Sequence, residues 1–141
     1  EDVLVTHSLG SCLGFAAYDP ERRVAGLIHC LLPTHSGNKK AIENPYMFVT
    51  SGIPAMIREM YERGARRENL ILKAAGCGRM LNVTNAFNTG ERNFEALEKL
   101  LAKNELTLAA KDVGGSAPRT VFLHVGTGRV VLRSRKKEWE L

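Results

Sequence analysis

Short apolar segments separated by turn residues run through most of this 141-residue chain, and they constrain its fold more than any other feature. Three occur early, at residues 3–6, 13–18 and 24–32, with a polar connection at residues 19–23 between the second and the third. Apolar runs of this length bounded by turn residues predict β-strands. We expect these three strands to pair in chain order as a meander.

Further strands are predicted in the second half of the chain. Residues 69–75 read as a buried strand that ends at the glycine-containing corner Gly76-Cys77-Gly78-Arg79. Residues 106–113 and 119–125 are predicted strands, and residues 125–129 are typical of a hairpin turn into another strand at 130–133. The polar segment at residues 34–40 predicts a loop instead.

Two amphipathic helices separate these strands. The first opens at Asn44-Pro45 and closes at Gly64, and Pro54 predicts either a kink or a fresh start from Ser51. Its buried face carries Val49, Ile53, Met56, Ile57 and Met60. The second helix is indicated by Asn88 and Glu91, which have capping-box spacing. It is followed on one face by Phe94, Leu97, Leu100 and Leu101.

This order of elements predicts the fold class. Several strands with two helices set apart along the chain favour an α+β fold, a layered α/β sandwich with a mixed, largely antiparallel sheet. The length is that of one domain, and an apolar fraction of 44% is sufficient for a single core. We therefore expect one domain over residues 1–141, with residues from about 134 to 141 as a basic C-terminal extension.

Composition excludes several classes of function. No apolar run approaches the roughly 20 residues that span a bilayer, and the start of the chain lacks the basic region of a signal peptide, so no membrane insertion is expected. The net charge of +5 comes from scattered basic residues without a nucleic-acid-binding motif, so no nucleic-acid partner is expected. A basic surface also suits an acidic protein partner. The three cysteines form no CxxC pair, which favours a reducing, cytoplasmic location.

Cys12 and His29 are the candidate catalytic pair. Cys12 ends the tripeptide Gly10-Ser11-Cys12 after the first predicted strand, and His29 lies within the third. Adjacent strands can carry both side chains to one end of a sheet. A thiolate attacks carbon, so a catalytic cysteine needs a nearby base and backbone N–H donors for the oxyanion it creates. Small residues at Gly10 and Ser11 let those donors approach a substrate.

An ordered set of motifs resembles the chemoreceptor glutamine deamidases of bacterial and archaeal chemotaxis, the CheD family. The match covers nearly the whole chain and consists of Thr6, Leu9 to Cys12, His29, Asn88 to Asn93, Asp112 to Gly115, Arg119 and the hairpin at Gly128. The resemblance implies a sandwich similar to the cytotoxic necrotizing factor deamidases. It also implies chemotaxis receptors as substrates, the phosphatase CheC as a partner, and no cofactor or metal.

The resemblance also implies roles for single residues. Cys12 is the expected nucleophile, His29 the base, and Thr6 the third member, which acts through its hydroxyl or its backbone carbonyl. The reaction expected is acyl transfer from a glutamine carboxamide through a thioester, with release of ammonia. The oxyanion would be held by backbone donors around Gly10 and Ser11. Candidate substrate contacts are Arg79, Asn82, Arg92, Asn93 and Arg119.

Two alternatives remain open at this point. In one, the domain is a non-catalytic module that docks on a chemotaxis phosphatase or receptor, although intact Cys12, His29 and Thr6 argue against it. In the other, Cys12, Cys77 and either His29 or Cys30 hold a metal, although the chain lacks the close ligand pairs of a zinc site.

Overall fold

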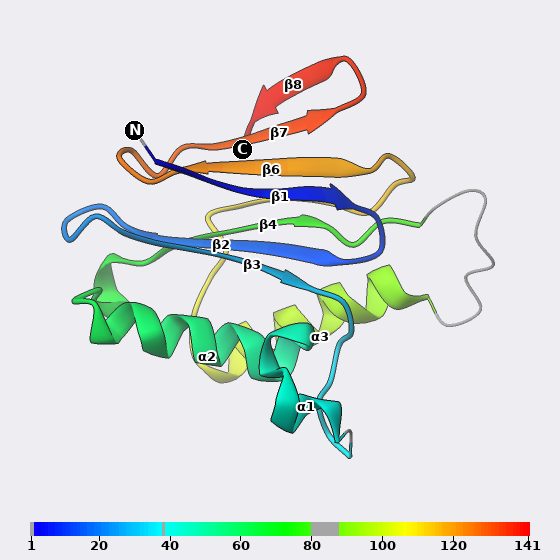
Figure 1. The fold of residues 1–141 in the computed structure, drawn as a ribbon, viewed down its shortest axis with the longest axis horizontal. Helices are drawn as coiled ribbons and strands as arrows, with labels where there is room; N and C mark the ends of the chain where they lie inside the picture. The colour runs from blue at the N-terminus through cyan, green and yellow to red at the C-terminus, as the bar shows by residue number, and fades with distance from the viewer. Residues whose placement is uncertain (1, 38, 80–87) are drawn as a thin grey trace.

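The fold has three layers, formed by two four-stranded sheets and a layer of helices. The computed structural model describes residues 2–37, 39–79 and 88–141. Figure 1 shows one sheet stacked on the other, with the longer helices covering the outer face of the second sheet. The first sheet has the order β1 (Val3–Leu9), β6 (Arg119–His124), β7 (Val130–Ser134), β8 (Lys137–Glu140). The second has the order β3 (Val24–Cys30), β2 (Leu13–Asp19), β4 (Ile71–Gly76), β5 (Ala110–Val113).

The strand pairings confirm the predicted α+β class and its largely antiparallel pairing, but the strands form two sheets and not the single sheet expected. β4 and β5 pair in parallel, whereas the other neighbouring strands of the described sheets pair antiparallel. The helices are α1 (Lys40–Glu43), α2 (Val49–Glu62) and α3 (Thr89–Lys103), with short 3-10 helices at Pro45–Met47 and Arg67–Asn69. Among the residues described, no helix is long and apolar enough to cross a bilayer.

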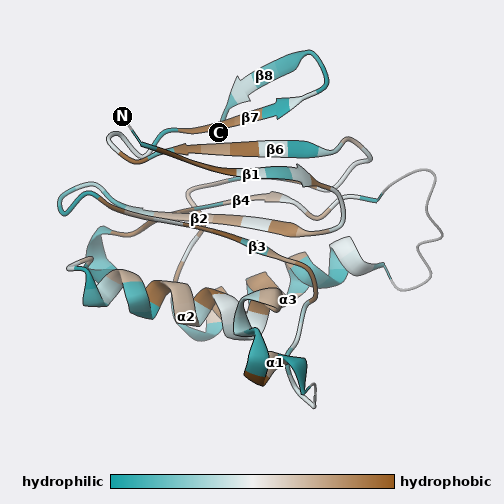
Figure 2. Ribbon diagram, viewed as in Figure 1, coloured by the Kyte–Doolittle hydropathy of each residue, from teal (hydrophilic) through white to brown (hydrophobic). Residues whose placement is uncertain are grey.

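Two apolar clusters lie on the two faces of the second sheet. Between this sheet and the helices, Phe15 and Cys30 pack with Ile53 of α2 and Leu97 of α3. Between the two sheets, Leu9 packs with residues that include Ala16, Val121, Leu123 and Leu132. Because β2 is covered on both faces, every one of its residues is buried. Figure 2 shows hydrophilic and hydrophobic stretches alternating along α2 and α3, as expected of helices with one face on the core.

The expected meander is wrong for its first strand. β2 and β3 do pair, but β1 pairs with β6, which is more than a hundred residues away in sequence. After Leu9 the chain turns at residues 10–12 and enters the other sheet, so β1 lies over the second sheet instead of beside β2. β1 and β3 consequently form edge strands of two different sheets, and they contact each other.

The first predicted helix is confirmed, but its beginning differs. α2 starts at Val49 and continues through Pro54 without a fresh start at Ser51. Asn44-Pro45 instead opens the 3-10 helix, where proline suits the first turn because it has no N–H to leave unpaired.

The second predicted helix is confirmed as α3, whereas its expected capping box is wrong. Asn88 takes a left-handed conformation (φ 47°) and makes no side-chain cap. A left-handed backbone does not present the side chain to the first-turn N–H groups as an extended N-cap does.

The end of the chain is not the basic extension expected for residues 134–141. Lys137–Glu140 forms β8, which pairs with β7, and the Trp139 indole donates to Asp112 Oδ2 at 2.7 Å. The segment at residues 106–113 is also shorter as a strand than expected, since β5 begins at Ala110. β8 follows β7 through a short hairpin, whereas the extent of β5 is decided by its pairing with β4, which is distant in sequence.

Candidate active site

A hydrogen bond between side chains of two different sheets marks the candidate site. Thr6 Oγ1 of β1 lies 2.8 Å from His29 Nδ1 of β3, and both residues are partly buried. The contact is made by the threonine hydroxyl, one of the two possibilities that the sequence left open. Because β1 and β3 are edge strands, the imidazole lies at the open side of the space between the sheets.

Cys12 lies at the same end of the second sheet. The next residue, Leu13, pairs with Cys30, the residue after His29. Cys12 packs against the apolar cluster between the sheets, as does Leu27, which shares a face of β3 with His29 two residues on. The sheet register therefore brings the predicted nucleophile and the predicted base to one face and one end of the sheet.

The backbone of the loop that carries Cys12 is held at three successive carbonyl groups. The Gly10 carbonyl accepts from the N–H of Gly78, and the Cys12 carbonyl from the N–H of Cys77, each at 2.8 Å. The Ser11 carbonyl accepts from Asn93 Nδ2 at 3.0 Å. The N–H groups of Ser11 and Cys12 donate to no acceptor among the described residues, as is required of the oxyanion donors predicted from the sequence.

The corner that holds this loop requires left-handed backbone conformations. Gly76 has φ 96° and Cys77 has φ 51°. A Cβ at Gly76 would collide with the Cys12 carbonyl oxygen, so glycine lets the corner approach the loop.

A β-bulge in β1 directs the chain toward the site. Thr6 pairs with Val121 and Leu9 with Arg119, so β1 holds one more residue than β6 over this stretch. Ser8 within the bulge has φ 51°, and its N–H donates to Thr120 Oγ1 at 3.3 Å. The extra residue buries Leu9 between the sheets and leaves the next residues to cross to the second sheet.

Burial affects the two predicted catalytic groups in opposite senses. It raises the pKa of the Cys12 thiol above 9.0 and lowers the pKa of the His29 imidazole below 6.5. Each shift favours the neutral form of its group, so the resting pair near neutral pH is a thiol and a neutral imidazole. Burial raises the pKa values of Cys30 and Cys77 to about 12, with a contribution from the nearby Cys12. These two thiols are therefore far less reactive.

Two of the predicted substrate contacts are buried and bond to the protein itself. The Arg119 guanidinium donates to Asp112 Oδ1 at 3.1 Å and to the carbonyls of Gly76 and Gly114. Asn93 is fully buried, and its amide donates to backbone carbonyls. Neither side chain is placed to touch a substrate in this conformation, and both instead hold the walls of the site.

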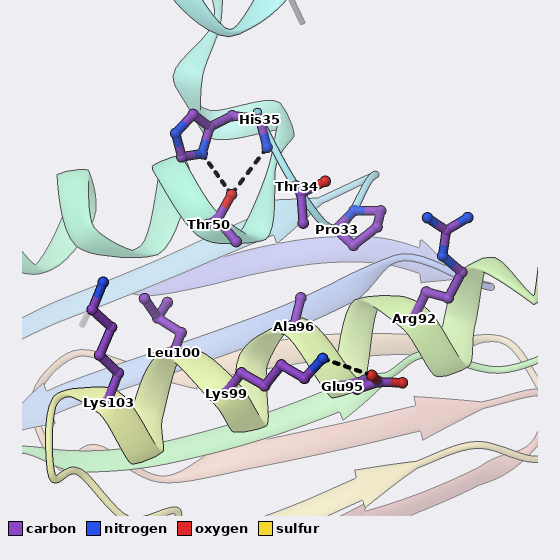
Figure 3. A pocket seen from close by; sticks show the side chains of 10 residues that line it. All are labelled: Pro33, Thr34, His35, Thr50, Arg92, Glu95, Ala96, Lys99, Leu100 and Lys103. Carbon is purple, nitrogen blue, oxygen red and sulfur yellow. Dashed lines mark hydrogen bonds and ion pairs between the residues drawn. The ribbon is translucent and has the colours of Figure 1, made fainter. Parts of the chain in front are cut away.

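The other predicted substrate contacts have different surroundings. Arg79 is exposed directly after the corner, and its N–H donates to the Gly115 carbonyl at 2.7 Å. Asn82 lies outside the described residues. Arg92 lies at one end of a groove between α3 and the segment at residues 33–35 (Figure 3). Lys99 and Lys103 lie further along the same helix. Glu95 on this wall pairs with Lys99 at 2.9 Å, so the excess positive charge of the α3 wall comes from Arg92 and Lys103.

The metal alternative finds no ligand set in the part of the chain that the structure describes. No group of three or more His, Cys, Asp or Glu side chains there is arranged to hold an ion. Cys30 and Cys77 pack in the apolar cluster beneath the helices, whereas Cys12 packs between the sheets.

Comparisons with known proteins agree with the motif resemblance. The family model of CheD, described as chemotactic sensory transduction, matches residues 31–134. A probable chemoreceptor glutamine deamidase CheD of Solibacter usitatus is 42% identical over 100% of this chain and 84% of its own length. A probable chemoreceptor glutamine deamidase CheD 2 of Anaeromyxobacter dehalogenans is 41% identical over 94% of this chain and 84% of its own length.

The similarity extends to archaea. A probable chemoreceptor glutamine deamidase CheD of Thermococcus kodakarensis is 38% identical over 93% of this chain and 82% of its own length. The family model and relatives of this identity and coverage agree on one family. The chain belongs to the CheD family.

Proposed function

We propose that this protein is a protein-glutamine deamidase that converts glutamine side chains of chemotaxis receptors to glutamate. The receptor substrate is suggested by the names of the relatives, and the chemistry by the site. The observation that carries the proposal is the contact between Thr6 and His29, at the end of the sheet where Cys12 lies. A hydrogen-bonded imidazole beside a partly exposed cysteine is the arrangement that nucleophilic catalysis requires.

The proposed reaction begins with transfer of the Cys12 proton to His29. The thiolate forms a C–S bond to the carboxamide carbon of the glutamine, and the oxygen takes up the negative charge opposite the Ser11 and Cys12 N–H groups. The C–N bond then breaks, and the imidazolium supplies the proton with which ammonia leaves. Water that loses its proton to the same imidazole attacks the thioester and breaks the C–S bond. The receptor side chain leaves as glutamate, and the sulfur regains its proton from the imidazolium.

Thr6 holds the imidazole in the orientation that this sequence of steps needs. If His29 Nδ1 carries the hydrogen and donates it to Thr6 Oγ1, the lone pair of Nε2 is left to accept the proton of Cys12. Because burial favours the neutral forms of both groups, the proton moves as the substrate arrives and not before.

The remaining expectations from the sequence belong to this proposal. They are a partnership with the phosphatase CheC and a layout shared with the cytotoxic necrotizing factor deamidases, which the resemblance implies, and a cytoplasmic location, which the cysteine pattern favours. The positive charge on the α3 wall of the groove suits an acidic protein partner, whether the receptor or the phosphatase.

The test is deamidation of a receptor cytoplasmic fragment by wild type, Cys12→Ala and His29→Ala. We expect wild type to release ammonia and to raise the mass of a receptor glutamine by about one dalton, the amide-to-acid exchange of this chemistry. Both variants should be inactive yet folded, whereas the controls Cys30→Ala and His124→Ala should keep their activity. An active Cys12→Ala variant would overturn the proposal. A wild type that binds the fragment without deamidating it would support the binding-module alternative.

A further inference from the structure

We infer that Asn93 is the positioning residue that aims the N–H of Cys12 into the site, a role that rests on the proposed function. Asn93 lies in the second turn of α3 and is 0% exposed. Its Nδ2 donates to the Ser11 carbonyl at 3.0 Å and to the Leu31 carbonyl at 3.1 Å. One side-chain amide thus uses both of its hydrogens on the backbone around the nucleophile and the base.

The bond to Ser11 determines the direction of the next N–H. In a planar trans peptide the carbonyl and the following N–H point in opposite directions. Since the Ser11 carbonyl points to α3, the N–H of Cys12 points away from the helix layer. That is the side of the second sheet on which Cys12, Thr6 and His29 lie. Asn93 therefore orients an oxyanion donor without touching the substrate.

The bond to Leu31 couples this donor to the base. Leu31 follows Cys30, which pairs with Leu13 next to Cys12. Asn93 therefore bridges the start of β2 and the end of β3 just beyond the last pair of their ladder. A shift of either strand end would stretch one of the two bonds, so the amide keeps the nucleophile loop and the strand of His29 in register.

The surroundings of the side-chain oxygen of Asn93 support a role for its NH₂ group. Asn93 Oδ1 is buried and has no hydrogen-bond partner among the described residues. A buried unpaired acceptor is destabilising, and an apolar side chain of similar volume would avoid it. Asparagine is explained by its two N–H donors, since an apolar side chain would leave the Ser11 and Leu31 carbonyls without this donor.

The start of α3 packs closely against the corner at Cys77 and Gly78 that holds the nucleophile loop. Gly90 lies one turn before Asn93 in α3, and a Cβ there would collide with the carbonyl oxygens of Cys77 and Gly78. Because this contact is between backbone atoms, it fixes the position of the start of α3 more tightly than a contact between flexible side chains could.

The test compares two reactions of Cys12 in the Asn93→Leu variant. Acylation by p-nitrophenyl acetate forms a C–S bond and expels p-nitrophenolate through an oxyanion, whereas alkylation by iodoacetamide displaces iodide and forms none. We expect Asn93→Leu to acylate roughly a hundredfold more slowly, the scale of losing one oxyanion donor, and to be alkylated at close to the wild-type rate. In receptor deamidation kcat should fall by a similar factor while KM changes little.

Two further variants complete the design. Asn104→Leu is the matched control. The side-chain amide of Asn104 also donates to a backbone carbonyl, that of Leu100, but Asn104 follows the C-terminal end of α3, away from the nucleophile loop. It should leave both rates unchanged. If Asn93→Leu does not fold, Asn93→Ala removes the two N–H donors without adding volume or charge and should show the same selective loss.

Wild-type acylation in either folded variant would overturn the inference while leaving the proposed function intact. Equal losses of acylation and alkylation would also overturn it, since they would indicate general damage to the nucleophile. The acylation assay needs no receptor, so failure of the proposed function, seen as an active Cys12→Ala variant, is a separate result.

Discussion

The hydroxyl oxygen of Thr6 lies 2.8 Å from Nδ1 of His29, and this bond joins the edge strands of two different sheets. The residues are 23 positions apart in the chain, and neither strand pairs with the other. The orientation of the imidazole therefore depends on how the sheets stack. A site that is divided between two layers is sensitive to side-chain changes that leave each sheet intact.

The Thr6 hydroxyl can be tested with an isosteric change. Thr6→Val keeps the branched shape but removes the hydrogen-bond partner of His29 Nδ1, so the ring is no longer held in one orientation. Loss of a hydrogen bond worth about 1 kcal/mol predicts a fall in kcat on the order of fivefold to tenfold. Thr6→Ser retains the hydroxyl and should keep most of the activity. Equal kcat values for the Val and Ser variants would show that the hydroxyl does not matter.

The pH dependence of thiol labelling tests the neutral resting pair. Because the pKa of Cys12 is raised above 9.0 and that of His29 is lowered below 6.5, we expect the rate of iodoacetamide labelling to rise with pH through the alkaline range. A thiolate–imidazolium pair would instead give a plateau that extends into the acid range. Mass spectrometry should find the label on Cys12 and not on Cys30 or Cys77, whose pKa values are about 12.

The pH profile of deamidation should have its acid limb below 6.5. His29 must be neutral to accept the Cys12 proton, and burial lowers the pH at which it becomes protonated. The measurement is kcat/KM for a receptor fragment between about pH 5 and pH 8, the range in which an imidazole titrates. An acid limb above 6.5 would mean that a carboxylate or another anion stabilises the imidazolium.

Asp19 provides a test of stability away from the site. Its carboxylate is fully buried and accepts hydrogen bonds from the N–H groups of Glu21, Arg22 and Arg66 and from the amide of Asn69. Burial alone would raise the pKa of Asp19, but these hydrogen bonds outweigh it and hold the pKa below 3.8. Asp19→Asn turns an NH₂ group toward N–H donors and should lower Tm by roughly 5 °C or more.

The sign of the pH effect follows from that lowered pKa. Since the folded value lies below the unfolded one, the contribution of Asp19 to stability is complete above about pH 3.8 and is lost as the pH falls through the folded value. The difference in Tm between wild type and Asp19→Asn should therefore narrow in acid. Glu21→Gln is the control, because Glu21 is exposed and accepts only at 3.2 Å from Asn69. Thermal unfolding followed by circular dichroism measures both variants.

Gly90 tests the backbone contact beneath the nucleophile loop. In Gly90→Ala the new methyl group must displace the corner at Cys77 and Gly78, because backbone atoms cannot move aside as a side chain can. Overpacking of this kind predicts a loss of about 1–3 kcal/mol in the free energy of unfolding. Glu91→Ala, at the next and exposed position, should change it little. Urea denaturation of both variants gives the comparison, and equal midpoints would contradict the prediction.

Local sequence patterns were sufficient to predict most of the strands and helices, and to place Cys12 near His29. Alternating and helical periodicities depend on near neighbours, so they predicted β2, β3, β4 and the two longer helices. The short connection between β2 and β3 made their pairing predictable, and with it the placing of Cys12 beside the strand of His29. Motif resemblance then indicated the family.

Long-range contacts account for what those patterns missed. The sequence around Asn93 does not show whether its side chain contacts substrate or is buried against the backbone, because its hydrogen-bond partner Ser11 lies 82 residues away. The same holds for Arg119, whose guanidinium bonds to the Gly76 carbonyl 43 residues earlier.

The sequence by itself determined which segments become strands and helices, and it placed a cysteine and a histidine on a local hairpin, because periodicity and turn chemistry act over a few residues. Only the tertiary structure decided that β1 leaves the meander to pair with β6, that Thr6 meets His29 across two layers, and that Asn93 is buried behind the nucleophile. Those outcomes depend on which apolar faces cover one another, a property of the whole core that no single segment of the chain contains.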